Sequence, residues 1–174
     1  ERSDYTGDLI KGLPLVVTSH RGKSAFNLSP FQGNDTELKP VIPFSYDLEK
    51  VTPFSYSVYL DEQQTTIEYA VSHQAAIYHM VFTKKGAVSL IVNSKEGELK
   101  WNGTAISGHQ QLENNTRVFI YLETDSRPQS QVALIDNKVR ENTRSAKGKN
   151  ACLILKYAES AGALKVRYGI SFIS

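Results

Sequence analysis

The chain of 174 residues is poor in cysteine and in long apolar runs, and each shortage excludes a class of structure. Cys152 is the only cysteine, so no disulfide can form within the chain. Its aliphatic neighbours in ACLILKY predict a buried, unreactive thiol. No apolar run approaches the roughly 20 residues that cross a bilayer, so no membrane span is expected.

The sequence also lacks an excess of positive or negative charge. The 20 Lys and Arg nearly balance the 18 Asp and Glu, and the net charge is +2. A protein that binds nucleic acid usually carries a clear excess of positive charge, which this chain lacks. Nucleic acid is therefore not an expected partner. One basic cluster is interrupted by acidic and small residues, and we interpret it as a solvated loop. It consists of Arg140, Arg144, Lys147 and Lys149.

Recognisable catalytic and metal-binding motifs are missing. The histidines His20, His73, His79 and His109 lie in unrelated segments without an HExxH pair, so a zinc site has no support. No GxSxG elbow occurs, and no glycine-rich phosphate loop follows a predicted strand. The residues themselves therefore predict no catalytic site and no metal site.

Carboxylates are clustered in two places outside the predicted turns. Asp4 and Asp8 lie in DYTGD, and Asp47 and Glu49 lie in FSYDLEK. Paired carboxylates can hydrolyse a glycosidic bond. Turn or rim roles are the simpler interpretation, and we favour them here.

Apolar residues at every second position dominate what the sequence does contain. The predicted strands are rich in Val, Ile, Tyr and Phe and cover residues 13–17, 56–60, 66–72, 77–82, 88–93, 117–123, 131–135, 151–157 and 164–172. Turn signals are found at residues 84–86, 95–97, 102–103, 136–137 and 160–162. This spacing predicts an all-β, antiparallel sandwich in one domain, residues 1–174.

Three details refine that prediction. Val132, Ile135 and Val139 fit a helical stripe, but a hairpin through residues 136–137 is preferred. The region from Gly22 to Thr52 carries three prolines and is expected to form at most short strands. On the last strand, the even-numbered side chains are expected to face the core. They are Leu164, Val166, Tyr168, Ile170 and Phe172.

Two stretches resemble glycoside hydrolase family 92. PFSYDLEKVTPFSYSVYLDE (Pro43–Glu62) is similar to a family segment that runs Phe-Ser-His-x-x-Glu-x-Ala-x-Pro-Gly-Tyr-Tyr-x-Val-x-Leu, and VRYGISFIS (Val166–Ser174) is similar to the run that closes the family's N-terminal domain. SDYTGD (Ser3–Asp8) and AAIYHMVF (Ala75–Phe82) resemble two further family segments. The first segment matches at Phe44, Ser45, Glu49, Pro53, Tyr56, Val58 and Leu60.

The resemblance implies a galactose-mutarotase-like supersandwich as the fold. In the family this domain precedes a linker and a helical (α/α)6 catalytic domain, so the chain is expected to be a fragment cut at that boundary and also trimmed at its start. The absent helical domain is then its expected partner. Two family histidines are replaced here, one by Tyr46 and the other by Tyr78.

The resemblance also implies an activity for the parent protein. Family members are calcium-dependent exo-α-mannosidases that invert the anomeric centre, so the expected substrate is a mannose-containing glycan and the expected location is periplasmic or extracellular. Both catalytic carboxylates and the calcium ligands belong to the helical domain, so no catalytic residue, metal ligand or cofactor is expected in this chain. Asp4 is the one candidate for substrate binding.

Two other functions remain open from the residues. A stand-alone carbohydrate-binding or adhesion sandwich would bind sugar through exposed aromatic side chains such as Tyr46, Phe54 and Trp101. Core or domain-interface roles for these residues are the simpler interpretation. A sugar mutarotase would need a histidine acid and a carboxylate base facing one pocket.

Overall fold

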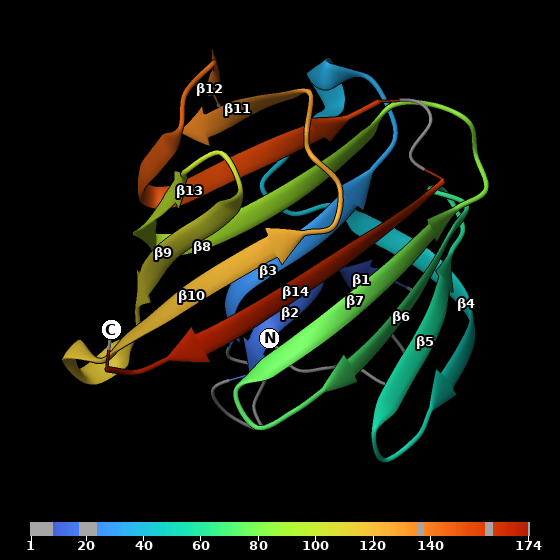
Figure 1. Cartoon of the computed structure of the whole chain (residues 1–174), viewed down its shortest axis with the longest axis horizontal. Helices are drawn as coiled ribbons and strands as arrows, with labels where there is room; N and C mark the ends of the chain where they lie inside the picture. The colour runs from blue at the N-terminus through green and yellow to red at the C-terminus, as the bar shows by residue number, and fades with distance from the viewer. Residues whose placement is uncertain (1–8, 18–23, 136–137, 159–161, 174) are drawn as a thin grey trace.

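The structure is a computed structural model that describes residues 9–17, 24–135, 138–158 and 162–173. Strands make up most of it (Figure 1). They are β1 (Leu9–Lys11), β2 (Leu13–Val17), β3 (Ser24–Phe31), β4 (Pro43–Val51), β5 (Ser55–Leu60), β6 (Thr65–Val71), β7 (Ala75–Phe82), β8 (Val88–Trp101), β9 (Ala105–Gln111), β10 (Arg117–Thr124), β11 (Ser130–Ile135), β12 (Lys138–Glu141), β13 (Ser145–Tyr157) and β14 (Ala163–Ser171). The short 3-10 turns η1 (Asp35–Glu37) and η2 (Glu113–Asn115) are the helical elements of the described residues.

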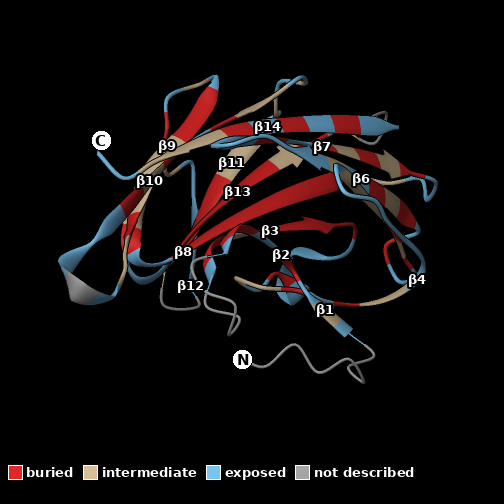
Figure 2. Ribbon diagram, turned by 90° about the horizontal axis from the view of Figure 1, so that it is seen from below, coloured by how far each residue is buried: buried red, intermediate tan, exposed pale blue. Residues whose placement is uncertain are grey.

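The strands form an antiparallel sandwich, as the sequence predicts. Hydrogen-bonded neighbours follow the order β1-β4-β5-β6-β7-β14-β10-β9-β8-β13-β11-β12, and β3 pairs with both β2 and β8. Figure 2 shows β6, β7 and β14 in one layer and β1, β2 and β3 in a second layer beneath it. Buried segments of both layers face each other between them.

Strand β8 joins the two layers because it changes partners along its length. Its first part pairs with β3, and its last part, from Gly97, pairs with β9. Glu96, at the change, has a φ of 51°. A Cβ on Gly97 would lie 2.1 Å from the His109 carbonyl oxygen, so a glycine is needed where the backbones approach. The predicted turn at residues 95–97 is therefore wrong, because these residues bend a continuous strand.

Strand β14 shows how alternation places side chains in the core. Leu164, Val166 and Tyr168 are buried, and exposed residues alternate with them along the strand (Figure 2). Ile170 is partly buried against the core, as expected. Phe172 is 50% exposed, so the register prediction fails beyond the end of the strand.

Two further predictions from the sequence are corrected. The region 22–52 holds two long strands, β3 and β4, and β4 accommodates an irregular step between Asp47 and Lys50 through a positive φ at Leu48. The basic cluster is exposed as expected, but Arg140 lies on β12 and Lys147 on β13 rather than in a loop. The preferred hairpin is confirmed by the antiparallel pairing of β11 with β12, although residues 136–137 lie outside the described residues.

Candidate functional surface

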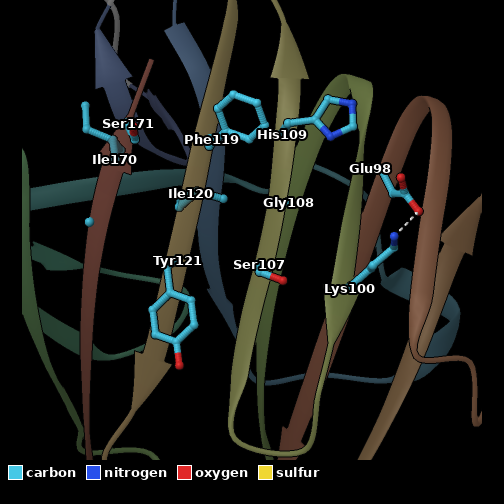
Figure 3. A pocket seen from close by; sticks show the side chains of 11 residues that line it. Glu98, Lys100, Ser107, Gly108, His109, Phe119, Ile120, Tyr121, Ile170 and Ser171 are labelled. Atoms are coloured by element: carbon cyan, nitrogen blue, oxygen red, sulfur yellow. Dashed lines mark ion pairs between the residues drawn. The ribbon is translucent and has the colours of Figure 1, made fainter. Parts of the chain in front are cut away.

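The outer face of the sheet is hollowed where β8, β9, β10 and β14 lie side by side (Figure 3). The hollow has a volume of about 550 Å³. The rings of His109 and Phe119 lie beside each other in it, with centroids 5.9 Å apart. Tyr121 follows Phe119 on the same face, and Gly169 places no side chain there. The floor is therefore apolar and partly bare sheet.

A second hollow of about 550 Å³ continues this surface over β7 and β14. It shares Tyr121 and Gly169 with the first hollow. Its lining includes Val71, which is 58% exposed, and Ile77, which is 45% exposed. We call the two hollows together the outer trough. A contiguous apolar surface of this kind is typical of a site that another protein segment covers.

Charged residues beside the outer trough are paired within the sheet. Glu98 and Lys100 form an ion pair of 3.1 Å, which Figure 3 marks with a dashed line. Glu123 and Arg167 form another of 2.8 Å. The Glu123 carboxylate also raises the pKa of the neighbouring Tyr121 hydroxyl by accepting its hydrogen bond. These pairs give both carboxylates a structural role on the sheet surface.

A row of tyrosines crosses the inner face of β5, β6, β7 and β14. Ring centroids are 5.2 Å apart for Tyr56 and Tyr69, 5.0 Å for Tyr69 and Tyr78, and 6.2 Å for Tyr78 and Tyr168. Tyr78 is buried, and its hydroxyl lies 3.5 Å from the Pro14 carbonyl oxygen of the opposite layer. Burial raises the pKa of Tyr78. Tyr78 therefore packs in the core.

Of the four carboxylates singled out in the sequence, Asp47 and Glu49 lie among the described residues. Asp4 and Asp8 lie outside the described residues, so the predicted substrate contact of Asp4 stays a prediction. The Asp47 carboxylate accepts a 2.7 Å hydrogen bond from the Leu48 backbone N–H, and Glu49 accepts one of 2.7 Å from the Tyr56 hydroxyl. Asp47 thus lies within strand β4, at its irregular step, and not in a turn, whereas Glu49 is bonded to one end of the tyrosine row.

The aromatic residues considered for sugar binding do not share one exposed face. Trp101 is 6% exposed and belongs to the core, which confirms the simpler interpretation. Tyr46 is half-buried against the core, and Phe54 is 72% exposed in the connection between β4 and β5. Cys152 is fully buried, and burial raises the pKa of its thiol to about 12, as expected for an unreactive cysteine.

His109 lines the first hollow together with Glu98, but the Glu98 carboxylate is paired with Lys100 at 3.1 Å. His79 lies 3.3 Å from the Glu68 carboxylate on the exposed faces of β7 and β6, away from the outer trough. His73 is exposed, and His20 lies outside the described residues. In the part of the chain that the structure describes, no group of three or more His, Cys, Asp or Glu residues could hold a metal ion.

Phe119 and Tyr121 are surface residues that the sequence analysis does not predict, although the sequence carries a signal for them. RVFIYLE (117–123) is apolar at consecutive positions as well as at alternate ones. Such a run predicts a strand covered on both faces. The core covers one face of β10, through Val118, Ile120 and Leu122, and the outer trough is the other.

No helix among the described residues is long and apolar enough to cross a membrane. A comparison with curated proteins finds no significant match. Residues 3–171 match the family described as the glycosyl hydrolase family 92 N-terminal domain.

Solved structures with a similar fold include two enzymes from Bacteroides thetaiotaomicron. One is a family GH92 inverting mannosidase, with a TM-score of 0.73 and 20% identity over 86% of this chain and 22% of that chain. The other is a family GH92 α-mannosidase, with a TM-score of 0.81 and 18% identity over 98% of this chain and 27% of that chain. This chain therefore spans about a quarter of the length of the solved chains that it matches.

Proposed function

The chain belongs to the glycosyl hydrolase family 92 N-terminal domain family, and from this premise we propose that it is the non-catalytic N-terminal domain of an exo-α-mannosidase. The match over residues 3–171 is the observation that carries the proposal. The parent enzyme cleaves α-mannosidic bonds of mannose-rich glycans outside the cytoplasm, in the periplasm or the extracellular space. The fragment alone is inactive.

The division of labour follows from the chemistry of inversion. An inverting glycosidase needs a general acid and a general base on opposite sides of the sugar, roughly 6.5–9.5 Å apart, to leave room for a water. Glu98 and Glu123, the carboxylates beside the outer trough, are instead engaged by cations of their own sheet. We therefore assign the acid, the base and the calcium ions to the part of the parent protein outside this chain.

The outer trough is the proposed docking surface for the helical domain of the parent. It combines exposed apolar side chains with a bare stretch of sheet at Gly169, which allows another segment to approach closely. Ser171, the last residue of β14, lines the first hollow, so the chain leaves the sandwich beside this surface. Inter-domain contacts typically bury roughly 600–1,500 Å².

An aryl α-mannoside and a mannose disaccharide, offered separately to the fragment and to the parent protein, test this proposal. We expect turnover by the parent, loss of that turnover when a calcium chelator is added, and none by the fragment. Turnover by the fragment would refute the division of labour. A parent that binds mannosides without cleaving them would favour the carbohydrate-binding alternative.

A further inference from the structure

Three exposed apolar side chains lie on the hairpin formed by β4 and β5. Leu48 is 67% exposed, and Val51 and Phe54 are each 72% exposed. Among the described residues, Ile173 is the only large apolar residue that is more exposed. We call Leu48, Val51 and Phe54 the hairpin patch. Single exposed apolar residues are normal on a protein surface, but three on one short hairpin indicate a contact surface.

Hydrogen bonds hold the hairpin patch in one conformation. In the turn, the Thr52 Oγ1 accepts hydrogen bonds from the backbone N–H groups of Phe54 and Ser55, over 3.4 and 2.9 Å. Leu48 has a φ of 54°, which is unfavourable for a residue with a Cβ, and the Asp47 carboxylate accepts a hydrogen bond from its backbone N–H. The backbone thus adopts an unfavourable conformation with an apolar side chain exposed, which folding of this domain does not explain.

The hairpin patch continues the outer trough around the end of the sheet. Ser55, the neighbour of Phe54, is paired with Ala70, and Ala70 and Val71 line the second hollow. The turns of the β4–β5 and β6–β7 hairpins therefore lie at the same end of the sheet (Figure 1). Strands β5 and β7 are two strand spacings apart, or about 10 Å. A domain that covers the second hollow can therefore also reach the hairpin patch.

On the inner face of the sheet, Val51 extends the tyrosine row. Val51 is paired with Tyr56, and Tyr56 is paired with Tyr69, so the three side chains lie on one face. Tyr56 and Tyr69 are half-buried, whereas Tyr78, farther along the row, is buried. Among the described residues, the row therefore becomes more exposed toward the hairpin, where its aromatic surface can be covered by a partner.

The rest of the parent protein is the occupant that best fits this surface. The chain spans about a quarter of the length of the solved chains that it matches, so under the proposed function most of the parent is covalently linked to it. Such a link gives a high effective concentration, at which a small apolar contact forms readily. The charged residues beside the patch are Asp47, Glu49 and Lys50, which give no excess of positive charge for a lipid surface.

We propose that the hairpin patch is a second contact with the helical domain of the parent protein. The domain interface then extends around the end of the sheet, from the outer trough to the β4–β5 hairpin. This inference rests on the proposed function and adds a surface to its docking site. Val51 and Phe54 become buried on docking, and the fixed turn reduces the conformational entropy that is lost.

Thiol labelling measures whether the hairpin patch is covered. Phe54→Cys introduces an exposed thiol, whereas the native Cys152 is fully buried and burial raises the pKa of its thiol, so it reacts far more slowly. A maleimide is offered to the fragment and to the parent, and peptide mass spectrometry follows the modification at position 54. We expect labelling at least about tenfold slower in the parent, because reaction requires local opening of the interface. Val139→Cys, 48% exposed on β12, is the control and should react equally fast in both.

Ile77→Cys, in the second hollow, separates this inference from the proposed function. Slow labelling of the parent at positions 54 and 77 supports an interface that covers both surfaces. Slow labelling at position 77 alone overturns the hairpin contact and leaves the proposed docking surface standing, whereas fast labelling at both positions overturns both. If position 54 reacts slowly in the fragment and faster on dilution, a second copy covers the patch and the inference is overturned.

Discussion

The hydroxyl of Tyr168 on β14 donates a 2.6 Å hydrogen bond to the backbone carbonyl oxygen of Leu15 on β2. This bond joins the two layers of the sandwich between residues 153 positions apart in the sequence. The hydroxyl of Tyr78 lies 3.5 Å from the adjacent Pro14 carbonyl oxygen. Strand β2 is thus held against the opposite layer by side chains of β14 and β7 as well as by its pairing with β3.

The Tyr168–Leu15 bond should contribute measurably to stability. Tyr168→Phe removes the donor and leaves a buried carbonyl oxygen unpaired, so we expect a loss of about 1–3 kcal/mol in the free energy of unfolding. Urea denaturation at neutral pH measures it. Tyr121→Phe, which removes an exposed hydroxyl, is the matched control and should change little. Equal effects of the two variants would contradict a structural role for the bond.

Stability should fall at high pH because of the buried tyrosines. Burial raises the pKa of Tyr168 to about 12, and burial likewise raises the pKa of Tyr157 to about 12. The pKa of an unfolded tyrosine is about 10, so between about pH 10 and 12 the folded state keeps protons that the unfolded state releases. The contribution is therefore complete below pH about 10 and is lost as pH rises toward 12. Urea denaturation across this window should give a falling free energy of unfolding, with a shallower fall for Tyr168→Phe.

The bend in β8 should depend on a glycine. Gly97→Ala would place a Cβ 2.1 Å from the His109 carbonyl oxygen and 2.2 Å from the Ser94 Oγ, so the backbone must move. We expect a loss of about 1–3 kcal/mol in the free energy of unfolding, measured by urea denaturation. Gly162→Ala is the control, because a Cβ there meets nothing within 4 Å. A fully stable Gly97→Ala variant would show that the strands can separate without cost.

The outer trough should matter in the parent protein and not in the fragment. Ile77→Lys places a charge in the trough, at a side chain that is already 45% exposed. We expect little change in the melting temperature of the fragment but a clear fall in that of the parent, because the charge would be buried under the docked domain. Val139→Lys, 48% exposed on β12, is the control. Identical behaviour of both variants in the parent would place the docking surface elsewhere.

The sequence was sufficient to predict those strands in which apolar and polar side chains alternate. LPLVV was predicted as a strand over 13–17 and is β2 with those bounds. The pattern also predicted Leu164, Val166 and Tyr168 to be buried, as they are. These predictions succeeded because one face of each strand is turned toward the core, so every second side chain is buried and apolar. The resemblance to family 92, carried by short motifs in order, was confirmed over residues 3–171.

The sequence failed where a residue's role is set by a distant strand. Lys95-Glu96-Gly97 has the composition of a turn, yet the pairing of Gly97 with both Gln110 and Gly148 keeps it within a strand. Because the region 22–52 contains prolines, the long strand β3 was not predicted there. In the structure Pro30 is nevertheless paired with Leu90 in the sheet. Local composition cannot distinguish a bend from a reversal, because hydrogen bonds to other strands decide between them.

Alternation of apolar residues by itself determined the fold class and most of the core, because the period of a strand is a local property. Tertiary structure alone decided which faces meet. It placed Asn93 beside Asn27 and near Gln110, and it left Tyr121 on the same open surface as Ile77. Side chains far apart in the sequence become neighbours only when strand order and register are fixed, and these depend on the packing of the whole sandwich.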